Sequence, residues 1–252
     1  MKTALKTDIG LIRSVNEDRA LVHQGLGGLS WAIVADGMGG HQAGDIASQV
    51  AVDTISEQLL ATLKEEKENL DIAAAIREAV FRANEKVYTI ASSQSHYHGM
   101  GTTVVVALAD AENVVIGHIG DSRAYHWNGT ELIQLTEDHS LVNELVKSGQ
   151  ISAEEANRHP RRNVLTRALG TEPYVDVEIR QFRWLRNDIL LLCTDGLTGM
   201  VGLARMKEVL STEQPIEWKA DRLVKYALEA GGDDNVTVLL MANMESDERE
   251  AG

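Results

Sequence analysis

Carboxylate side chains recur in short turns at five places along the 252-residue chain, and four of these turns contain glycine. The five segments are Asn16-Glu17-Asp18, Asp36-Gly37-Met38-Gly39-Gly40, Gly120-Asp121-Ser122, Thr194-Asp195-Gly196 and Gly232-Asp233-Asp234-Asn235. Any one of them has an ordinary explanation, since aspartate accepts backbone hydrogen bonds in a turn and glycine takes a positive φ there. If several converge, however, two carboxylates about 4 Å apart repel by about 4 kcal/mol at an effective dielectric near 20. A converging group therefore needs protons or bound cations, and it predicts a metal centre.

The ligands available to such a centre are oxygen atoms. No cluster of histidine and cysteine accompanies the acidic turns, and oxygen-only ligand sets favour Mg²⁺ or Mn²⁺ over zinc. A backbone carbonyl from an Asp-Gly turn would add a further ligand, because glycine lets the chain approach an ion closely.

Two of the acidic turns follow strongly apolar runs. Residues 30–35 precede Asp36, and the run that includes residues 189–193 leads to Asp195. Such runs are typical of buried strands, so both aspartates are expected at a sheet edge, where a rigid scaffold meets solvent. If the two strands neighbour one another, their terminal carboxylates converge.

The rest of the chain alternates between helical and strand-like periodicity. Apolar residues recur four apart over 45–63 and three or four apart over 72–90, which predicts two helices. Further strands are expected at 103–109, 114–119, 123–127, 132–135, 175–182, 188–193 and 236–241, and further helices at 140–148, 203–210 and 216–230. Asn128-Gly129 indicates a type I′ hairpin, and a capping box over 152–155 opens another short helix. Closely spaced strands pair antiparallel, which predicts an α+β layered domain.

Charge and composition restrict the partners. With 38 acidic and 24 basic residues the chain has a net charge of −14, which disfavours binding to nucleic acid and to anionic membranes. The acid excess either solubilises the surface or, in part, neutralises bound cations. Residues 1–8 lack the apolar stretch of a signal peptide, so none is expected, and no apolar span approaches the roughly 18 residues of a membrane helix. The single cysteine, Cys193, allows no intramolecular disulfide. We therefore expect a soluble, cytoplasmic protein with no nucleic-acid and no membrane partner.

Six segments in a fixed order carry a resemblance that covers nearly the whole chain, from Thr7 to Leu240. They are Arg13…Glu17-Asp18, Asp36-Gly37-Met38-Gly39-Gly40, Gly99-Met100-Gly101-Thr102-Thr103, Gly120-Asp121-Ser122-Arg123, Thr194-Asp195-Gly196 and Asp234-Asn235. In this order they resemble the metal-dependent Ser/Thr protein phosphatases of the protein phosphatase 2C family, and Met38 and the compact length resemble its bacterial branch. The resemblance implies a four-layer αββα sandwich of two antiparallel sheets flanked by helices. It also implies a single domain over 1–243, with a flap insertion at about 139–169, and a polar tail over 244–252.

The resemblance further implies a role for the acidic turns. Asp36 would bridge two Mn²⁺ or Mg²⁺ ions, and the carbonyl of Gly37 would help to hold the second. Asp195 and Asp234 would be ligands of the first ion; Asp234 is preferred to its acidic neighbour because it directly precedes the asparagine. Asp121 would join Asp195 around a third, weakly bound ion, or would simply cap its own turn.

The substrate phosphate has a candidate partner in Arg13, whose family counterpart binds it, and a planar guanidinium suits a bidentate contact. Glu17 and Asp18 match positions that act through metal-bound waters. In the implied reaction, a hydroxide that bridges two cations roughly 3.5–4 Å apart attacks phosphorus in line. Arg13 and the ions stabilise the charge on the equatorial oxygens. The protein then needs no nucleophile of its own, so neither Ser122 nor Cys193 is a candidate.

The sequence leaves the proton donor for the leaving group open. Eukaryotic members of the family carry a histidine directly after the Asp-Gly pair, where this chain has Met38. His41 is a candidate, through a water or by contacting substrate, and it is equally well explained as a surface or helix-start residue. Five other histidines are interpreted as loop or surface residues: His96, His98, His126, His139 and His159.

The flap is locally basic, with Arg158, Arg161, Arg162 and Arg167, and either attracts phosphorylated segments or is a solvated loop.

The leading hypothesis is a monomeric phosphatase for phosphoserine and phosphothreonine in proteins that opposes a bacterial Ser/Thr kinase. One alternative is an inactive phosphoprotein-binding module, which is disfavoured because every expected metal-binding acid is present. Another is a hydrolase of small phosphate esters.

Overall fold

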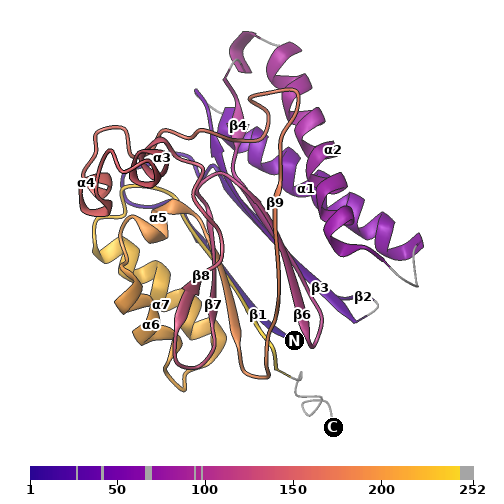
Figure 1. The fold of residues 1–252 in the computed structure, drawn as a ribbon, viewed down its shortest axis with the longest axis vertical. Helices are drawn as coiled ribbons and strands as arrows, with labels where there is room; N and C mark the ends of the chain where they lie inside the picture. The colour runs from indigo at the N-terminus through magenta and orange to yellow at the C-terminus, as the bar shows by residue number, and fades with distance from the viewer. Residues whose placement is uncertain (27, 41–42, 66–69, 94, 98, 245–252) are drawn as a thin grey trace.

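Two antiparallel sheets packed face to face, with helices on both outer sides, form the body of the protein (Figure 1). The computed structural model describes residues 1–26, 28–40, 43–65, 70–93, 95–97 and 99–244. The expected four-layer αββα arrangement is therefore confirmed.

Each sheet combines strands from distant parts of the chain. The first sheet has the order β1 (Lys2–Asp8), β11 (Val236–Ala242), β10 (Ile189–Cys193), β7 (Arg123–Trp127) and β8 (Leu132–Gln134). The second has the order β2 (Asp18–Leu26), β3 (Leu29–Met38), β5 (Val104–Ala109), β6 (Asn113–Ile119) and β9 (Glu178–Arg183), and β4 (Gly101–Thr102) pairs with the end of β3. Neighbouring strands run antiparallel, as their close spacing in the sequence predicted.

The helices are divided between the two outer faces. The second sheet is covered by α1 (Ala43–Glu65) and α2 (Ile72–Ser93), and the first by α6 (Leu203–Leu210) and α7 (Ile216–Glu229). At one end of the sandwich, near α5 (Asp195–Thr198), lie α3 (Leu141–Lys147) and α4 (Ala153–Asn157) of the flap (Figure 1). A single 3-10 turn, η1 (Ser95–Tyr97), follows α2. None of the described helices is both long and apolar enough to cross a membrane.

The continuous apolar runs of the sequence are strands buried on both faces. In β3, Trp31 and Ile33 pack under α1 and α2, whereas Ala32 and Val34 point into the layer between the sheets. In β10, Leu191 likewise faces α6 and α7, and its neighbours face the other sheet. Because successive side chains of a strand alternate between faces, a strand in the middle of four layers needs apolar residues at every position.

Local expectations from the sequence are mostly confirmed. Asn128-Gly129 does turn a hairpin between β7 and β8, but the type I′ assignment is wrong: the loop has four residues, 128–131, and of the pair only Gly129 has a positive φ. The side chain of Asn128 accepts hydrogen bonds from the backbone N–H of Thr130 (3.0 Å) and Glu131 (2.8 Å), which stabilises a wider turn. The capping box over 152–155 is present. The strand expected at 175–182 starts later, at Glu178, and strands β1 and β2 had not been anticipated.

Candidate metal centre

Five aspartates from separate turns lie together at one end of the two sheets. Asp18 begins β2 and lies opposite Asp36 of β3 in the strand register. Asp195 follows β10, Asp234 precedes β11, and these two strands are neighbours. Asp121 follows β6 of the second sheet. The strands that carry Asp36 and Asp195 belong to different sheets, so the carboxylates converge across the interface between the sheets and not along one sheet edge.

Burial and mutual repulsion raise the pKa of four of these carboxyl groups, those of Asp18, Asp36, Asp121 and Asp195. Burial raises the pKa of Asp18 to about 7, and the charge of Asp195 adds to the effect. Burial and Asp195 likewise raise the pKa of Asp121 to about 7. Burial, with repulsion from Asp18 and Asp195, raises the pKa of Asp36 well above its ordinary value. Burial and Asp234 raise the pKa of Asp195 as well. The cluster is therefore costly to ionise without a compensating positive charge.

Three carboxylate oxygens of the cluster are buried and have no hydrogen-bond partner among the described residues. These atoms are Oε1 of Glu17, Oδ1 of Asp18 and Oδ1 of Asp195. A buried carboxylate oxygen without a partner is strongly unfavourable unless a cation or an ordered water satisfies it. The donor set is made of oxygen atoms, so the residues present fit Mn²⁺ or Mg²⁺.

Asp18 is held in place by two threonines that the sequence analysis did not identify. The hydroxyl groups of Thr194 and Thr237 both donate to Oδ2 of Asp18, at 2.8 Å and 2.7 Å. Thr237 lies in β11 and Thr194 directly follows β10, and both strands belong to the first sheet, whereas Asp18 belongs to β2 of the second sheet. One carboxylate oxygen is thereby satisfied and the other is left free. Threonine next to Asp195 was visible in the sequence, but nothing in the spacing showed that it faces Asp18.

Two glycines allow the acidic turns to come close to other backbone segments. A Cβ atom on Gly37 would lie 2.0 Å from the carbonyl oxygen of Gly44 at the start of α1. A Cβ atom on Gly196 would lie 1.9 Å from the carbonyl oxygen of Asn235. Any side chain at either position would push these segments apart, so the glycines are required by close packing and not by φ.

The loop before β2 carries Arg13 and is hydrogen-bonded to Asn235, directly before β11. The side-chain amide of Asn235 donates to the carbonyl oxygens of Ile9 (2.9 Å) and Val15 (3.0 Å), and its oxygen accepts from the N–H of Glu17 (2.7 Å). Nη2 of Arg13 donates to Oδ2 of Asp234 at 2.7 Å, and the Arg13 side chain is 47% exposed. The guanidinium therefore lies at the mouth of the carboxylate cluster.

The backbone of Asp36 is fixed by two consecutive threonines. The carbonyl oxygen of Asp36 accepts from the hydroxyl of Thr102 and the N–H of Thr103, both at 2.9 Å, and its N–H donates to the Thr103 hydroxyl at 2.9 Å. Met38, two residues further on, lies against Gly101 of β4. His41, the candidate proton donor, lies outside the described residues.

Ser122 and Cys193, which the sequence analysis excludes as nucleophiles, are both buried. Ser122 is 1% exposed, and its hydroxyl is paired with that of Thr103 at 2.7 Å. Cys193 is fully buried in β10, and burial raises the pKa of its thiol to about 12. A thiol that stays protonated at neutral pH is a poor nucleophile.

A cavity of about 600 Å³ opens between the cluster and the flap. Asp121 and Asp195 line it on one side, and flap residues that include Asn143 and Arg162 line it on the other. Arg162 is thus the flap arginine that borders this cavity. Arg167 instead contacts Glu178 of β9 at 3.4 Å.

The interpretation of five histidines as loop or surface residues is wrong for His126, and His139 is a loop residue as expected but a buried one. His126 lies in β7 and pairs with Asp188 at 2.7 Å, with only 12% of its side chain exposed. His139 lies in a loop but is buried, and it pairs with Glu178 of β9 at 2.9 Å. His98 lies outside the described residues. Each buried histidine has its carboxylate partner about 40 residues or more away in sequence, so no local pattern could have indicated the pairing.

The chain resembles known proteins along nearly its full length. Residues 13–240 match the model of the family described as protein phosphatase 2C. A serine/threonine phosphatase, stp, from Listeria monocytogenes is 43% identical over 244 residues, which are 96% of this chain and 95% of the relative. The protein phosphatase PhpP from Streptococcus pneumoniae is 36% identical over 98% of this chain and 99% of its own length.

Solved structures show the same likeness. The serine/threonine phosphatase PstP/Ppp of Mycobacterium tuberculosis superposes with a TM-score of 0.85 at 35% identity, over 97% of this chain and 99% of that one. A structure of the catalytic domain of PstP in complex with two manganese ions has a TM-score of 0.81 at 34% identity, over 95% of this chain and 96% of that one.

Proposed function

Because the chain belongs to the protein phosphatase 2C family of metal-dependent Ser/Thr protein phosphatases, we propose that its carboxylate cluster binds two Mn²⁺ or Mg²⁺ ions and hydrolyses phosphoserine and phosphothreonine in proteins. The observation that carries the assignment is the group of buried carboxylate oxygens with no hydrogen-bond partner among the described residues, which belong to residues at the ends of strands from both sheets. Bound divalent cations supply Lewis acidity, which lowers the pKa of water and stabilises charge on phosphoryl oxygens.

Each acidic residue has a proposed place in this site. Asp36 is the proposed ligand shared by two ions; the charges of Asp18, Asp195, Asp121 and Asp234 all act on its carboxyl group. Asp195 and Asp234 are the proposed further ligands of one ion, and the carbonyl of Gly37 is proposed for the other. The firm hold on Oδ2 of Asp18 supports a role through ordered water for that residue, and the same role is proposed for Glu17.

Arg13 is the proposed phosphate-binding residue. Its guanidinium is anchored by one nitrogen to Asp234 and is half exposed, so other N–H groups remain at the mouth of the cluster. A planar guanidinium donates two parallel hydrogen bonds to a phosphoryl group and orients it. Asp121, which borders the same cavity as Asp195 and Arg162, is the proposed ligand of a third, weaker ion.

The leaving group needs a proton donor, and the side chain of Met38 has no proton to donate. His41 is the candidate that the sequence offers closest to the Asp36 turn, and its role stays a prediction.

Residues 1–243 are proposed to be one domain with the flap at 139–169, followed by a polar tail at 244–252. We further propose a monomeric cytoplasmic enzyme that opposes a bacterial Ser/Thr kinase; the lone buried cysteine is compatible with a reducing compartment.

The test compares phosphothreonine peptides with a small aryl phosphate, each with Mn²⁺, with Mg²⁺ and with EDTA. Release of phosphate from the peptides is expected with either metal and not with EDTA, and activity that survives full chelation would contradict the metal mechanism. Asp234→Asn should abolish turnover, whereas Asp233→Asn, its exposed neighbour, is the matched control and should keep it. Cleavage of the aryl phosphate alone would favour an enzyme for small esters.

A further inference from the structure

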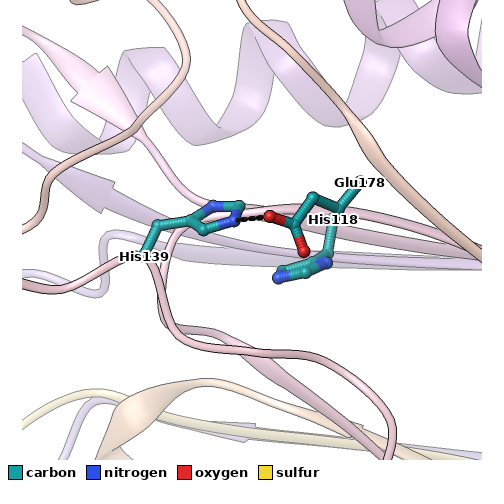
Figure 2. A group of neighbouring side chains, drawn as sticks. All are labelled: His118, His139 and Glu178. Atoms are coloured by element: carbon teal, nitrogen blue, oxygen red, sulfur yellow. Dashed lines mark hydrogen bonds and ion pairs between the residues drawn. The ribbon is translucent and has the colours of Figure 1, made fainter. Parts of the chain in front are cut away.

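His118, His139 and Glu178 form a compact cluster beside the flap (Figure 2). His118 in β6 and Glu178 in β9 are opposite each other in strand register, and His139 approaches from the loop after β8. The two imidazole rings stack with centroids 4.7 Å apart, and potential ligand atoms of all three side chains lie within 4.8 Å of one another. By spacing alone this group resembles a binding site for a transition metal.

The hydrogen bonds of the cluster argue against a metal. The N–H of Gly120 donates to Nδ1 of His139 (3.1 Å), so this nitrogen carries no proton. Nε2 must then carry the proton, which it donates to Oε1 of Glu178 at 2.9 Å, and a protonated nitrogen cannot bind a metal. Nε2 of His118 faces the carbonyl oxygen of Glu137 at 2.8 Å and must donate as well. Two ligand groups remain, fewer than the three that a protein zinc site needs.

We propose instead that His139 is a positioning residue, which holds the Gly120-Asp121 turn against the base of the flap in a tautomer selected by Glu178. Gly120 is bound at both its polar groups: its N–H donates to Nδ1 of His139, and its carbonyl oxygen accepts from the N–H of His139 at 2.9 Å. The carbonyl oxygen of His139 accepts from the N–H of Thr166 in the flap, at 2.9 Å. One buried residue thus connects the turn, the flap and β9.

The turn needs such support because Asp121, the residue directly after Gly120, lies among other acidic groups. Asp121 borders the cavity beside Asp195, and repulsion from Asp195 and Asp138 acts to displace it. Gly120 has φ +105°, and a Cβ atom there would lie 2.6 Å from Cβ of Thr103, so the backbone is in a conformation that only glycine adopts readily. The two hydrogen bonds to His139 fix the peptide units on both sides of this glycine. They therefore set where the Asp121 carboxylate lies.

This inference rests on the proposed role of Asp121 as a ligand of a weakly bound ion, and the test separates the two ideas. The paired variants are His139→Asn and His139→Gln. Asparagine places its amide oxygen near the position of Nδ1 and can accept from Gly120, whereas glutamine reaches toward Glu178 with its amide nitrogen and loses the acceptor. Mn²⁺ binding without substrate is measured by titration, with electron paramagnetic resonance of the free ion as the signal.

The glutamine variant should weaken the weakest Mn²⁺ site by about tenfold, the size expected when the support of a ligand is removed, and the asparagine variant should stay close to the wild type. Glu178→Ala should weaken the site, whereas Glu178→Gln, which can still accept from Nε2 of His139, should not. If His139→Gln does not fold, this second pair of variants provides the test. Equal Mn²⁺ binding by both members of each pair would overturn the proposal. The matched control is His126→Gln, which disrupts the other buried histidine–carboxylate pair and should lower Tm without changing Mn²⁺ binding.

Nitrogen-15 NMR of the imidazole rings gives a direct readout. The wild-type protein should show His139 protonated at Nε2 and unprotonated at Nδ1, and a proton on Nδ1 would overturn the proposal. Binding of Zn²⁺ that shifts both His118 and His139 would also overturn it in favour of a metal site. If Asp121→Asn leaves Mn²⁺ binding unchanged while the NMR result holds, the proposed ion ligand fails and the tautomer assignment stands.

Discussion

Replacing Asp18 with asparagine should make the cation-free protein more stable at neutral pH, although it alters the proposed metal centre. Asp18 is 1% exposed, and burial raises its pKa from 3.8 to about 7. Asparagine has nearly the same shape without the charge, and its amide oxygen can still accept from Thr194 and Thr237. The variant therefore keeps both hydrogen bonds and removes the cost of burying a carboxylate.

The magnitude follows from the pKa shift. A rise of about 3 pKa units, at about 1.4 kcal/mol per unit, corresponds to about 4 kcal/mol. Between about pH 4 and pH 7 the folded state keeps the proton on Asp18 and the unfolded state has released it, so wild-type stability falls as pH rises through this window. The advantage of Asp18→Asn in the free energy of unfolding should grow from near zero at about pH 4 to about 4 kcal/mol above about pH 7.

Urea unfolding in EDTA at several pH values across this window measures the difference directly. Adding Mn²⁺ should narrow the gap at neutral pH, because the ion binds the folded wild type and offsets its buried charge. Asp233→Asn, an exposed change of the same formal charge, should shift the free energy of unfolding by no more than about 0.5 kcal/mol. An Asp18→Asn variant that is equally or less stable than the wild type at neutral pH in EDTA would refute the reasoning.

Three other substitutions test the site. Gly37→Ala should destabilise the protein by about 3 kcal/mol or more, because the new Cβ would lie 2.0 Å from the carbonyl oxygen of Gly44. Gly40→Ala, whose Cβ would have no atom of the described residues within 4 Å, should keep the wild-type Tm in thermal unfolding. Arg13→Ala should raise KM for phosphopeptides by about tenfold or more, because the charge-assisted contact with the phosphoryl group is lost, with less effect on kcat; an unchanged KM would rule out phosphate binding. Ser122→Ala should retain turnover, since the hydroxyl is buried against Thr103, and an inactive, folded variant would reopen the question of a serine nucleophile.

Local pattern was enough to predict most elements of the fold. The apolar runs over 30–35 and 189–193 are buried on both faces and appear as β3 and β10, because a strand in the middle of the layers has no solvent face. Helix α6 has the bounds expected from its periodicity. Strand β1 was missed because its only apolar residues, Ala4 and Leu5, are adjacent and so show no alternation, and its pairing with β11 gives it its structure. The resemblance to a known family, and not periodicity, supplied the roles of the individual acids.

Which residues meet was decided only by the tertiary structure. The sequence determined that Asp36 and Asp195 would end buried strands, but the two carboxylates approach each other across the interface between sheets, a contact that strand periodicity does not encode. The two threonine hydroxyls that hold Asp18, and the histidine that holds Gly120, act across gaps of 19 residues or more. Periodicity reports which face of an element is buried, since that depends on local geometry alone. The partner of each buried polar group depends on how the layers stack, and that information is spread over the whole chain.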